Sequence, residues 1–204
     1  MPIVPVLLDA FLAKAVETQV GWHHDVDSFG LKMMSGGEPA SEGVPVLCRW
    51  LGRYGIARRV PVNRRAHLAH LIDFVRQLPA LPDNEEACLT ELIRQHGKLT
   101  ANLAAWRNAS ERSAASKLLW LRHPHDVPMF DRFDSVSLSV IANARGVCGD
   151  DYDAYARLVR AIYREHRPRI DDASRSAGYD YPIRVLDQVL SHAGRPRFAL
   201  KAGG

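Results

Sequence analysis

Apolar side chains recur at intervals of three and four residues along most of this chain, with polar side chains between them. That interval places the apolar side chains on one face of an α-helix. Alternating runs of valine, isoleucine and threonine, which would predict β-strands, are not found in the sequence. The pattern predicts an all-α protein, with helices over residues 3–20, 44–54, 64–78, 84–97, 100–107, 111–122, 132–145, 150–166 and 181–193.

Proline and glycine mark the expected ends of these helices, because both disfavour a continuing helical backbone. One long segment, "SFGLKMMSGGEPASEGVP" at 28–45, is rich in turn-forming residues. We expect it to be a mobile loop or a boundary between lobes that could fold over a ligand. Short helices joined by short turns favour an orthogonal helical array over a four-helix bundle, which needs fewer and longer helices.

The length of 204 residues is enough for one sizeable core, so we expect a single helical domain over 1–204, or two closely packed lobes. The apolar run at 2–15 contains Asp9 and Lys14 and lacks a basic start, which indicates a core helix rather than a signal peptide. No stretch reaches the roughly 18 to 20 uninterrupted apolar residues that span a bilayer. We therefore expect a cytoplasmic protein with no membrane partner.

Composition narrows the chemistry only a little. The cysteines Cys48, Cys88 and Cys148 are an odd number and lie far apart, so they predict neither a disulfide framework nor a CxxC metal site. The formal net charge of +4 is compatible with an anionic partner without requiring one. Because no P-loop, GxGxxG or Gx-Ser-xG element is present, we expect no cofactor.

One segment, "GRYGIARRVPVNRR" at 52–65, is strongly basic and contains no acidic residue. Guanidinium groups without counter-charges create a positive potential, and arginine holds phosphates with two parallel hydrogen bonds. The alternative is that these arginines pair with acids from elsewhere, such as "DNEE" at 83–86. The segment predicts a nucleic-acid contact through Arg53, Arg58, Arg59, Arg64 and Arg65.

A second segment, "NASERSAASKLLWLRHP", holds a single lysine, Lys117, after serines that are able to cap a helix at Ser110 and Ser113. If the helix begins at Ser113, Lys117 lies in its first turns, where the positive end of the macrodipole disfavours another cation. Lys117 also shares a helix face with Trp120 and Leu121, which would partly remove the amine from water. Both effects favour the neutral amine, the form that attacks carbon. The alternative is an ordinary solvated charge.

The next segment, "VPMFDRFD", begins with Val127 and Pro128, a pair that favours an extended backbone. Asp131 or Asp134 can then cap the following helix, and such a turn can bring a carboxylate back toward Lys117. This succession of lysine, Val-Pro and aspartate resembles the helix-hairpin-helix DNA glycosylases of the 8-oxoguanine glycosylase type. It is similar in particular to the small bacterial proteins described as having an 8-oxoguanine glycosylase fold. The resemblance is carried by the residues around 108–145.

The resemblance implies a helical glycosylase fold in which Lys117 is the nucleophile and Asp131 its carboxylate partner, with Asp134 as the fallback. The substrate would be a modified purine base in nucleic acid, DNA rather than RNA, flipped out of the duplex. The amine would attack the sugar C1′ as the base leaves, giving a Schiff base and a lyase activity of the kind used in base-excision DNA repair. Asp131 would stabilise the positive charge that develops on the sugar. The resembling proteins are also sometimes partners in antiviral defence systems, which implies a protein partner.

Aromatic residues near the lysine are candidates for stacking on the flipped base, a contact worth roughly 1 to 3 kcal/mol. The alternative for each of them is core packing. The candidates are Trp106, Trp120, Phe130 and Phe133.

Histidines are interpreted as structural rather than metal-binding. His123 and His125 flank Pro124 in "HPHD", but two histidines around a proline seldom converge on one ion, and no third ligand stands at the spacing needed. His67 and His70 are three apart on a predicted helix, where a surface role is expected. We therefore predict no metal site.

Two other functional classes remain open. A catalytically inactive module on the same fold could use its pocket to hold a nucleobase, a nucleotide or a protein segment. An unrelated helical scaffold, with Lys117 on its surface, is the third interpretation.

Overall fold

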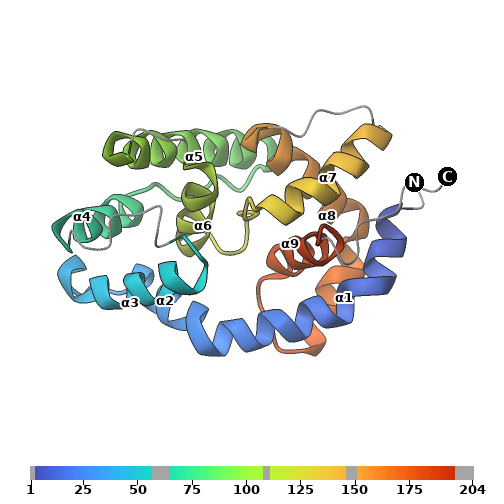
Figure 1. The fold of residues 1–204 in the computed structure, drawn as a ribbon, viewed down its shortest axis with the longest axis horizontal. Helices are drawn as coiled ribbons and strands as arrows, with labels where there is room; N and C mark the ends of the chain where they lie inside the picture. The colour runs from blue at the N-terminus through green and yellow to red at the C-terminus, as the bar shows by residue number, and fades with distance from the viewer. Residues whose placement is uncertain (1–2, 57–64, 108–110, 146–150, 196–204) are drawn as a thin grey trace. The chain divides into compact units, whose positions relative to one another are not determined.

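The computed structural model describes residues 3–56, 65–107, 111–145 and 151–195. Helices account for most of these residues, and no strand occurs within the described ranges (Figure 1). The prediction of an all-α protein is therefore confirmed.

The chain divides into two compact units. The continuous unit is Trp22–Pro124, and the discontinuous unit consists of Met1–Gly21 and His125–Gly204. The continuous unit contains η1 (His23–Asp27), a π-helix, followed by α2 (Ser28–Ser35), α3 (Ala40–Arg53), α4 (Arg65–Arg76), α5 (Glu85–Arg107) and α6 (Arg112–Arg122). The discontinuous unit contains α1 (Ile3–Trp22) up to Gly21, with α7 (Arg132–Arg145), α8 (Tyr152–Ser176) and α9 (Pro182–Ala193).

Each unit is built around one short helix that is buried on every side. In the continuous unit this is α6, in which every residue from Ala114 to Leu121 is buried, and α2, α4 and α5 pack around it (Figure 1). In the discontinuous unit it is α9, in which every residue from Ile183 to Leu190 is buried, and α7 and α8 pack against it. A helix buried all round cannot show an apolar and a polar face. Its polar residues must therefore find partners inside the core.

Most of the predicted helices are observed with similar bounds, but at two positions a residue expected to end a helix lies inside one. Gly97 does not end a helix, because Leu99 and Leu103 continue the buried face of α5 beyond it. Pro168 does not end α8, which continues to Ser176 with Ile170 still buried. At both places, burial of the apolar residues that follow outweighs the local helix-breaking tendency.

The prediction of a turn-rich loop at 28–45 is wrong. Residues 28–35 form α2, and α3 begins at Ala40. The glycines here allow close helix packing, since a Cβ on Gly30 would lie 2.9 Å from Leu121 Cδ2 and one on Gly43 would lie 2.8 Å from Met33 Cγ. Glycine serves close packing as well as turns, so the glycines of this segment did not indicate a loop.

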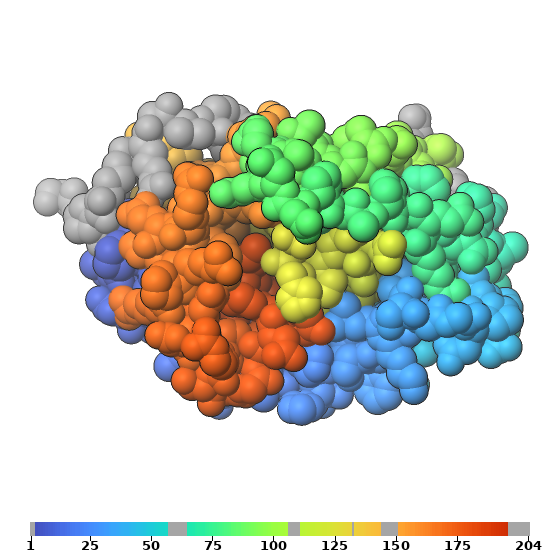
Figure 2. Space-filling view, turned by 180° about the vertical axis from the view of Figure 1, so that it is seen from behind, coloured from blue at the N-terminus to red at the C-terminus, as the bar shows by residue number. Residues whose placement is uncertain are grey.

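The long helix α8, orange in Figure 2, presents an exposed face of the discontinuous unit, and its sequence is rich in arginine and aspartate. Its first turn is capped by the Asp151 side chain, which accepts a hydrogen bond from Ala154 N at 2.7 Å. Ion pairs then follow along its surface, between Arg157 and Asp153 and between Arg167 and Asp171. The cap and the ion pairs stabilise the helix and indicate a structural role for its exposed face.

No helix in the described part of the chain combines the length and the apolar character that a bilayer span requires.

The contact between α7 and α9 leaves no room for a side chain at Gly194, because a Cβ there would lie 1.9 Å from the carbonyl oxygen of Phe133. We predict that Gly194→Ala lowers the free energy of unfolding by at least about 2 kcal/mol, since two backbones would have to separate. Gly97→Ala is the matched control, because Gly97 is exposed in α5 with nothing within 4 Å of its Cβ position. It should raise stability by up to about 1 kcal/mol through helix propensity. Urea denaturation measures both, and equal stability of the two variants would contradict the packing described here.

Candidate functional site

Lys117 lies inside the core of the continuous unit. Its side chain is only 4 % exposed, and its Nζ donates a hydrogen bond to Ser113 Oγ at 2.8 Å. Ser113 is one helical turn before Lys117, so both side chains project from the same side of α6. The alternative of an ordinary solvated lysine is therefore excluded by the structure. A buried amine held by a hydroxyl is a candidate nucleophile.

The start of α6 differs from the sequence-based expectation. The helix begins at Arg112, with Glu111 as the N-cap residue, and no side chain caps it. Ser113 does not cap the helix, because its hydroxyl accepts a hydrogen bond from the Lys117 amine instead. Ser110 lies outside the described residues. Lys117 is in the second turn, where the field of the macrodipole has already fallen. Burial, and not the helix terminus, is the main influence on this amine.

Both ends of α6 are fixed by buried polar contacts. His96 of α5 places its Nε2 3.0 Å from the carbonyl oxygen of Arg112 at the start of α6. After the end of α6, His123 places its Nε2 2.9 Å from Gln95 Oε1, and Gln95 in turn donates to the carbonyl oxygen of Pro79 at 2.9 Å. Burial lowers the pKa of His96 to about 4, and burial together with the Arg122 charge lowers the pKa of His123 to about 4.

The metal interpretation of "HPHD" gains no support from this geometry. His123 is buried and bonded to Gln95, whereas His125 is exposed and lies 5.0 Å from the ring of Tyr181. Within the described ranges, no three His, Cys, Asp or Glu side chains gather as a metal site would require.

Asp131 lies at the start of α7 in the discontinuous unit. Its Oδ1 accepts a hydrogen bond from the backbone N–H of Phe133 at 3.2 Å, so the predicted capping role is confirmed. Asp134, the fallback carboxylate, is buried in the first turn of α7, 3.4 Å from the hydroxyl of Tyr155. Of the two, Asp131 is the more accessible to a ligand.

The segment that leads into Asp131 is held by side chains that sequence reasoning missed. Asp187 of α9 accepts a hydrogen bond from the N–H of Met129 at 2.8 Å. Tyr155 of α8 donates to the carbonyl oxygen of Met129 at 2.6 Å, and Tyr152 donates to that of Pro128 at 3.2 Å. Each of these side chains is 24 or more positions away in sequence from the backbone group it bonds, so no local spacing could have indicated it.

Lys117 belongs to the continuous unit and Asp131 to the discontinuous unit. Ser113 was also missed, although its position four residues before Lys117 is a signal that helical spacing provides.

The aromatic candidates differ in accessibility. Trp120 is fully buried in α6, which favours core packing over stacking on a base. Phe130 and Phe133 are half-buried: the ring of Phe130 lies edge-on to Tyr155, and the guanidinium of Arg195 lies 5.9 Å from the ring centre of Phe133. Trp106 is in α5, but its side chain lies outside the described part of the structure.

Two arginines of the basic segment are described. Arg53 and Arg65 are both exposed, and neither forms an ion pair with another described residue, so the alternative of pairing with 83–86 is not observed for them. Arg58, Arg59 and Arg64 lie outside the described residues. The guanidinium of Arg53 covers the ring of Trp22 at 5.3 Å.

The ring of Trp22 lies edge-on to that of Tyr54, which bonds the buried carboxylate of Asp27 in the π-helix η1. Asp27 Oδ1 accepts hydrogen bonds from Trp50 Nε1 at 3.1 Å and from the Tyr54 hydroxyl at 2.8 Å. The arrangement joins η1 to α3 and holds an arginine and aromatic rings at the end of α3.

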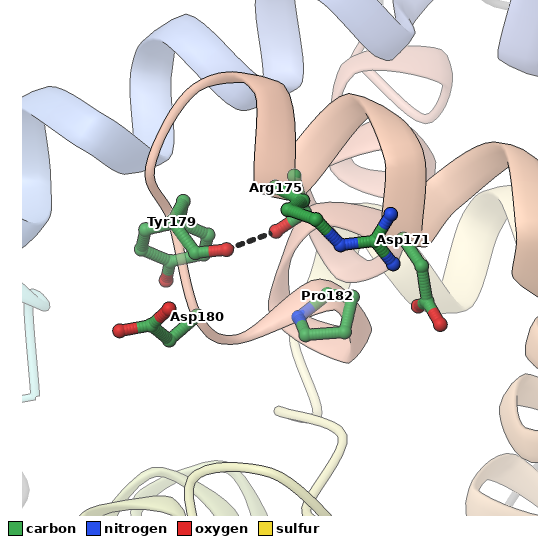
Figure 3. A pocket seen from close by; sticks show the side chains of 6 residues that line it. Asp171, Arg175, Tyr179, Asp180 and Pro182 are labelled. Carbon is green, nitrogen blue, oxygen red and sulfur yellow. Dashed lines mark hydrogen bonds between the residues drawn. The ribbon is translucent and has the colours of Figure 1, made fainter.

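A shallow pocket of about 220 Å³ lies where α8 turns into α9 (Figure 3). It is lined by Asp171, Ser174, Arg175, Tyr179, Asp180 and Pro182. Ser174 donates a hydrogen bond to the carbonyl oxygen of Tyr179, which closes the turn, and Arg175 pairs with Asp172. None of the predicted site residues lines this pocket, so it does not contribute to the lysine site.

Comparisons of the chain with protein-family models, with curated proteins and with solved structures found no match.

The two buried histidines generate a pH prediction. A histidine whose pKa falls from 6.5 in the unfolded chain to about 4 in the fold binds fewer protons when folded. Stability is therefore fully present above about pH 6.5 and is lost as the pH falls toward 4. Between pH 7 and pH 5, His96 should account for a loss of about 2 kcal/mol in the free energy of unfolding, and His123 should add to it.

Urea denaturation at the two pH values checks this prediction. His96→Gln should be less stable at pH 7 and should show a smaller loss between pH 7 and pH 5 than the native protein. His70→Gln, which changes an exposed histidine, is the control. A pH dependence that is the same in all three proteins would show that these buried histidines are not its source.

Proposed function

We propose that this protein is a DNA glycosylase with lyase activity that removes a modified purine base through a Schiff base at Lys117. The observation that supports this most is the buried amine of Lys117, 4 % exposed and held at 2.8 Å by Ser113. An enzyme that forms a Schiff base needs an amine that is kept in one position and removed from bulk water. A surface lysine meets neither condition.

The proposed reaction begins when the target nucleotide leaves the duplex and enters the site. The neutral amine of Lys117 attacks the sugar C1′ while the bond to the base breaks, and the base leaves with the bonding electrons. One amine proton passes to the departing base. The C1′–O4′ bond then breaks as the C=N bond of the Schiff base forms, and the ring oxygen takes the second amine proton. The carboxylate of Asp131 stabilises the positive charge that develops on the sugar before the C–N bond is complete.

Nucleic acid is the partner that the surface charges favour. Arg53 and Arg65 are exposed without ion pairs to described residues and belong to a segment with no acidic side chain. Guanidinium groups in this state are available to phosphates. The half-buried Phe130 and Phe133 adjoin Asp131 in sequence and are the candidates for contact with the flipped base.

The second candidate function is a catalytically inactive module that binds a nucleobase, a nucleotide or a protein, with an antiviral defence system as one setting. The hydrogen bond between Lys117 and Ser113 is compatible with this second function. A buried lysine with a purely structural role also needs a hydrogen-bond partner within the core.

Covalent trapping separates the two functions. We predict that borohydride traps the native protein on a duplex that contains a modified purine, and that Lys117→Gln abolishes trapping while duplex affinity changes less than about threefold, because the amine acts in the reacting state. The matched control is Lys98→Gln, which changes an exposed lysine of the continuous unit.

Trapping that persists in Lys117→Gln would assign the Schiff base to another amine. Duplex binding without trapping on any modified base would instead favour the inactive module.

The arginines generate a separate prediction about salt. If Arg53 and Arg65 contact phosphates, the logarithm of the association constant should fall linearly with the logarithm of salt concentration, by about 0.9 for each phosphate neutralised. Arg53→Ala and Arg65→Ala should each make this slope shallower by up to that amount. Arg157→Ala, which removes an arginine already paired with Asp153, should leave the slope unchanged. Fluorescence anisotropy over a salt series measures the slopes, and identical slopes in all variants would remove the basic segment from the interface.

A further inference from the structure

Both hydrogen-bonding groups of one backbone unit, Met129, are taken by side chains from two different helices. The N–H donates to Asp187 Oδ2 at 2.8 Å, and the carbonyl oxygen accepts from the Tyr155 hydroxyl at 2.6 Å. The preceding carbonyl, of Pro128, accepts from Tyr152 at 3.2 Å. Side chains of α8 and α9 therefore hold the extended segment two residues before Asp131.

The same hydroxyl joins two carboxylates. Tyr155 OH is 3.3 Å from Asp187 Oδ1 and 3.4 Å from Asp134 Oδ2, and Arg184 Nη1 is 3.8 Å from Asp187 Oδ2. Burial and the two carboxylates raise the pKa of Tyr155 well above its ordinary value, so it remains a hydrogen-bond donor.

Holding helices together through this network costs free energy, because it removes carboxylates from water. Asp187 and Tyr155 are fully buried, and Asp134 is 1 % exposed. Apolar side chains of similar size would pack α7, α8 and α9 without the cost of removing carboxylates from water. What the network provides, and apolar packing does not, is a fixed direction for the Met129 peptide.

The other side of Asp131 is also fixed to α9. Ser137 Oγ donates to the carbonyl oxygen of Leu190 at 2.7 Å, and Gly194 approaches the Phe133 backbone too closely for any side chain. Asp131 is therefore held from before, through Met129, and from after, through the first turns of α7.

We propose that Tyr155 and Asp187 are positioning residues that set the place and direction of the Asp131 carboxylate. The catalytic role of Asp131 rests on the proposed function. The hydrogen bonds that hold Asp131 do not depend on it. Asp187 bonds the N–H of Met129, and Tyr155 bonds its carbonyl oxygen. Because Met129 is only two residues before Asp131, fixing its peptide also restricts where the Asp131 side chain can lie.

The backbone N–H of Phe133 reports the position of Asp131 directly. It lies in the first turn of α7, where a helix offers it no backbone acceptor, and its acceptor is Asp131 Oδ1. Its exchange with deuterium, followed by NMR in the full chain, therefore measures how well Asp131 is held. The variant is Tyr155→Phe, which removes one oxygen and keeps the ring. Tyr163→Phe is the matched control, because its hydroxyl bonds Asp171 on the outer side of the same helix.

We expect the amides of Met129 and Phe133 to exchange roughly tenfold faster in Tyr155→Phe and at the native rate in Tyr163→Phe. The amide of Ile141, in the interior of α7, should keep its rate in both variants, which excludes a general loss of stability. If Tyr155→Phe does not fold, Tyr152→Phe removes the bond to Pro128 and should give the same pattern. An unchanged rate at Phe133 would overturn the proposal.

The same variants in the borohydride assay separate this proposal from the proposed function. If the native protein traps, Tyr155→Phe should lower the trapping rate at saturating duplex with the affinity unchanged, and a native rate would overturn the positioning role. If the native protein does not trap, the proposed function fails, and the exchange rate of Phe133 alone decides whether Asp131 is positioned by Tyr155.

Discussion

The removal of charged side chains from water is the constraint on which both units depend. Each unit is arranged around a helix with no solvent-facing side, and each of these helices carries ionisable residues: Lys117 in α6, and Arg184 and Asp187 in α9. A charge in such a place must be paired or hydrogen-bonded, or it destabilises the fold by several kcal/mol. Ser113 accepts from Lys117, Tyr155 and the N–H of Met129 donate to Asp187, and Arg184 lies 3.8 Å from the same carboxylate. In both units these contacts lie at or near the residues for which we propose a function.

Much of the helical structure follows from the sequence, because it depends on local spacing. The intervals of three and four residues gave helices close to the observed bounds, and the aspartate after Val127 and Pro128 caps α7 as its position predicts. The errors came where burial overrides local tendency. Gly30 and Gly43 serve close packing, and Gly97 and Pro168 lie within long helices whose buried residues continue past them.

The candidate site is less predictable, for a physical reason. The burial of Lys117 follows from its apolar neighbours, and Ser113 could have been found by helical spacing. The partners of Met129 could not, since its hydrogen bonds with Tyr155 and Asp187 join parts of the chain 26 and 58 residues apart. The sequence also suggested that the start of the helix acts on the Lys117 amine, and the structure does not support this. Its environment comes from burial in the second turn of α6 and not from the helix terminus.

The central proposal is that Lys117 and Asp131 act on one sugar, and a crystal structure of the protein with a duplex carrying an uncleavable abasic-site analogue tests it most directly. The measured quantities are the distances from Lys117 Nζ and from the Asp131 carboxylate to the carbon that stands for C1′. The account predicts that the amine lies about 3 to 3.5 Å from that carbon, as a reacting pair requires, with the carboxylate facing the same sugar. A complex in which the sugar lies away from Lys117, or in which the two side chains face different surfaces of the protein, would contradict it.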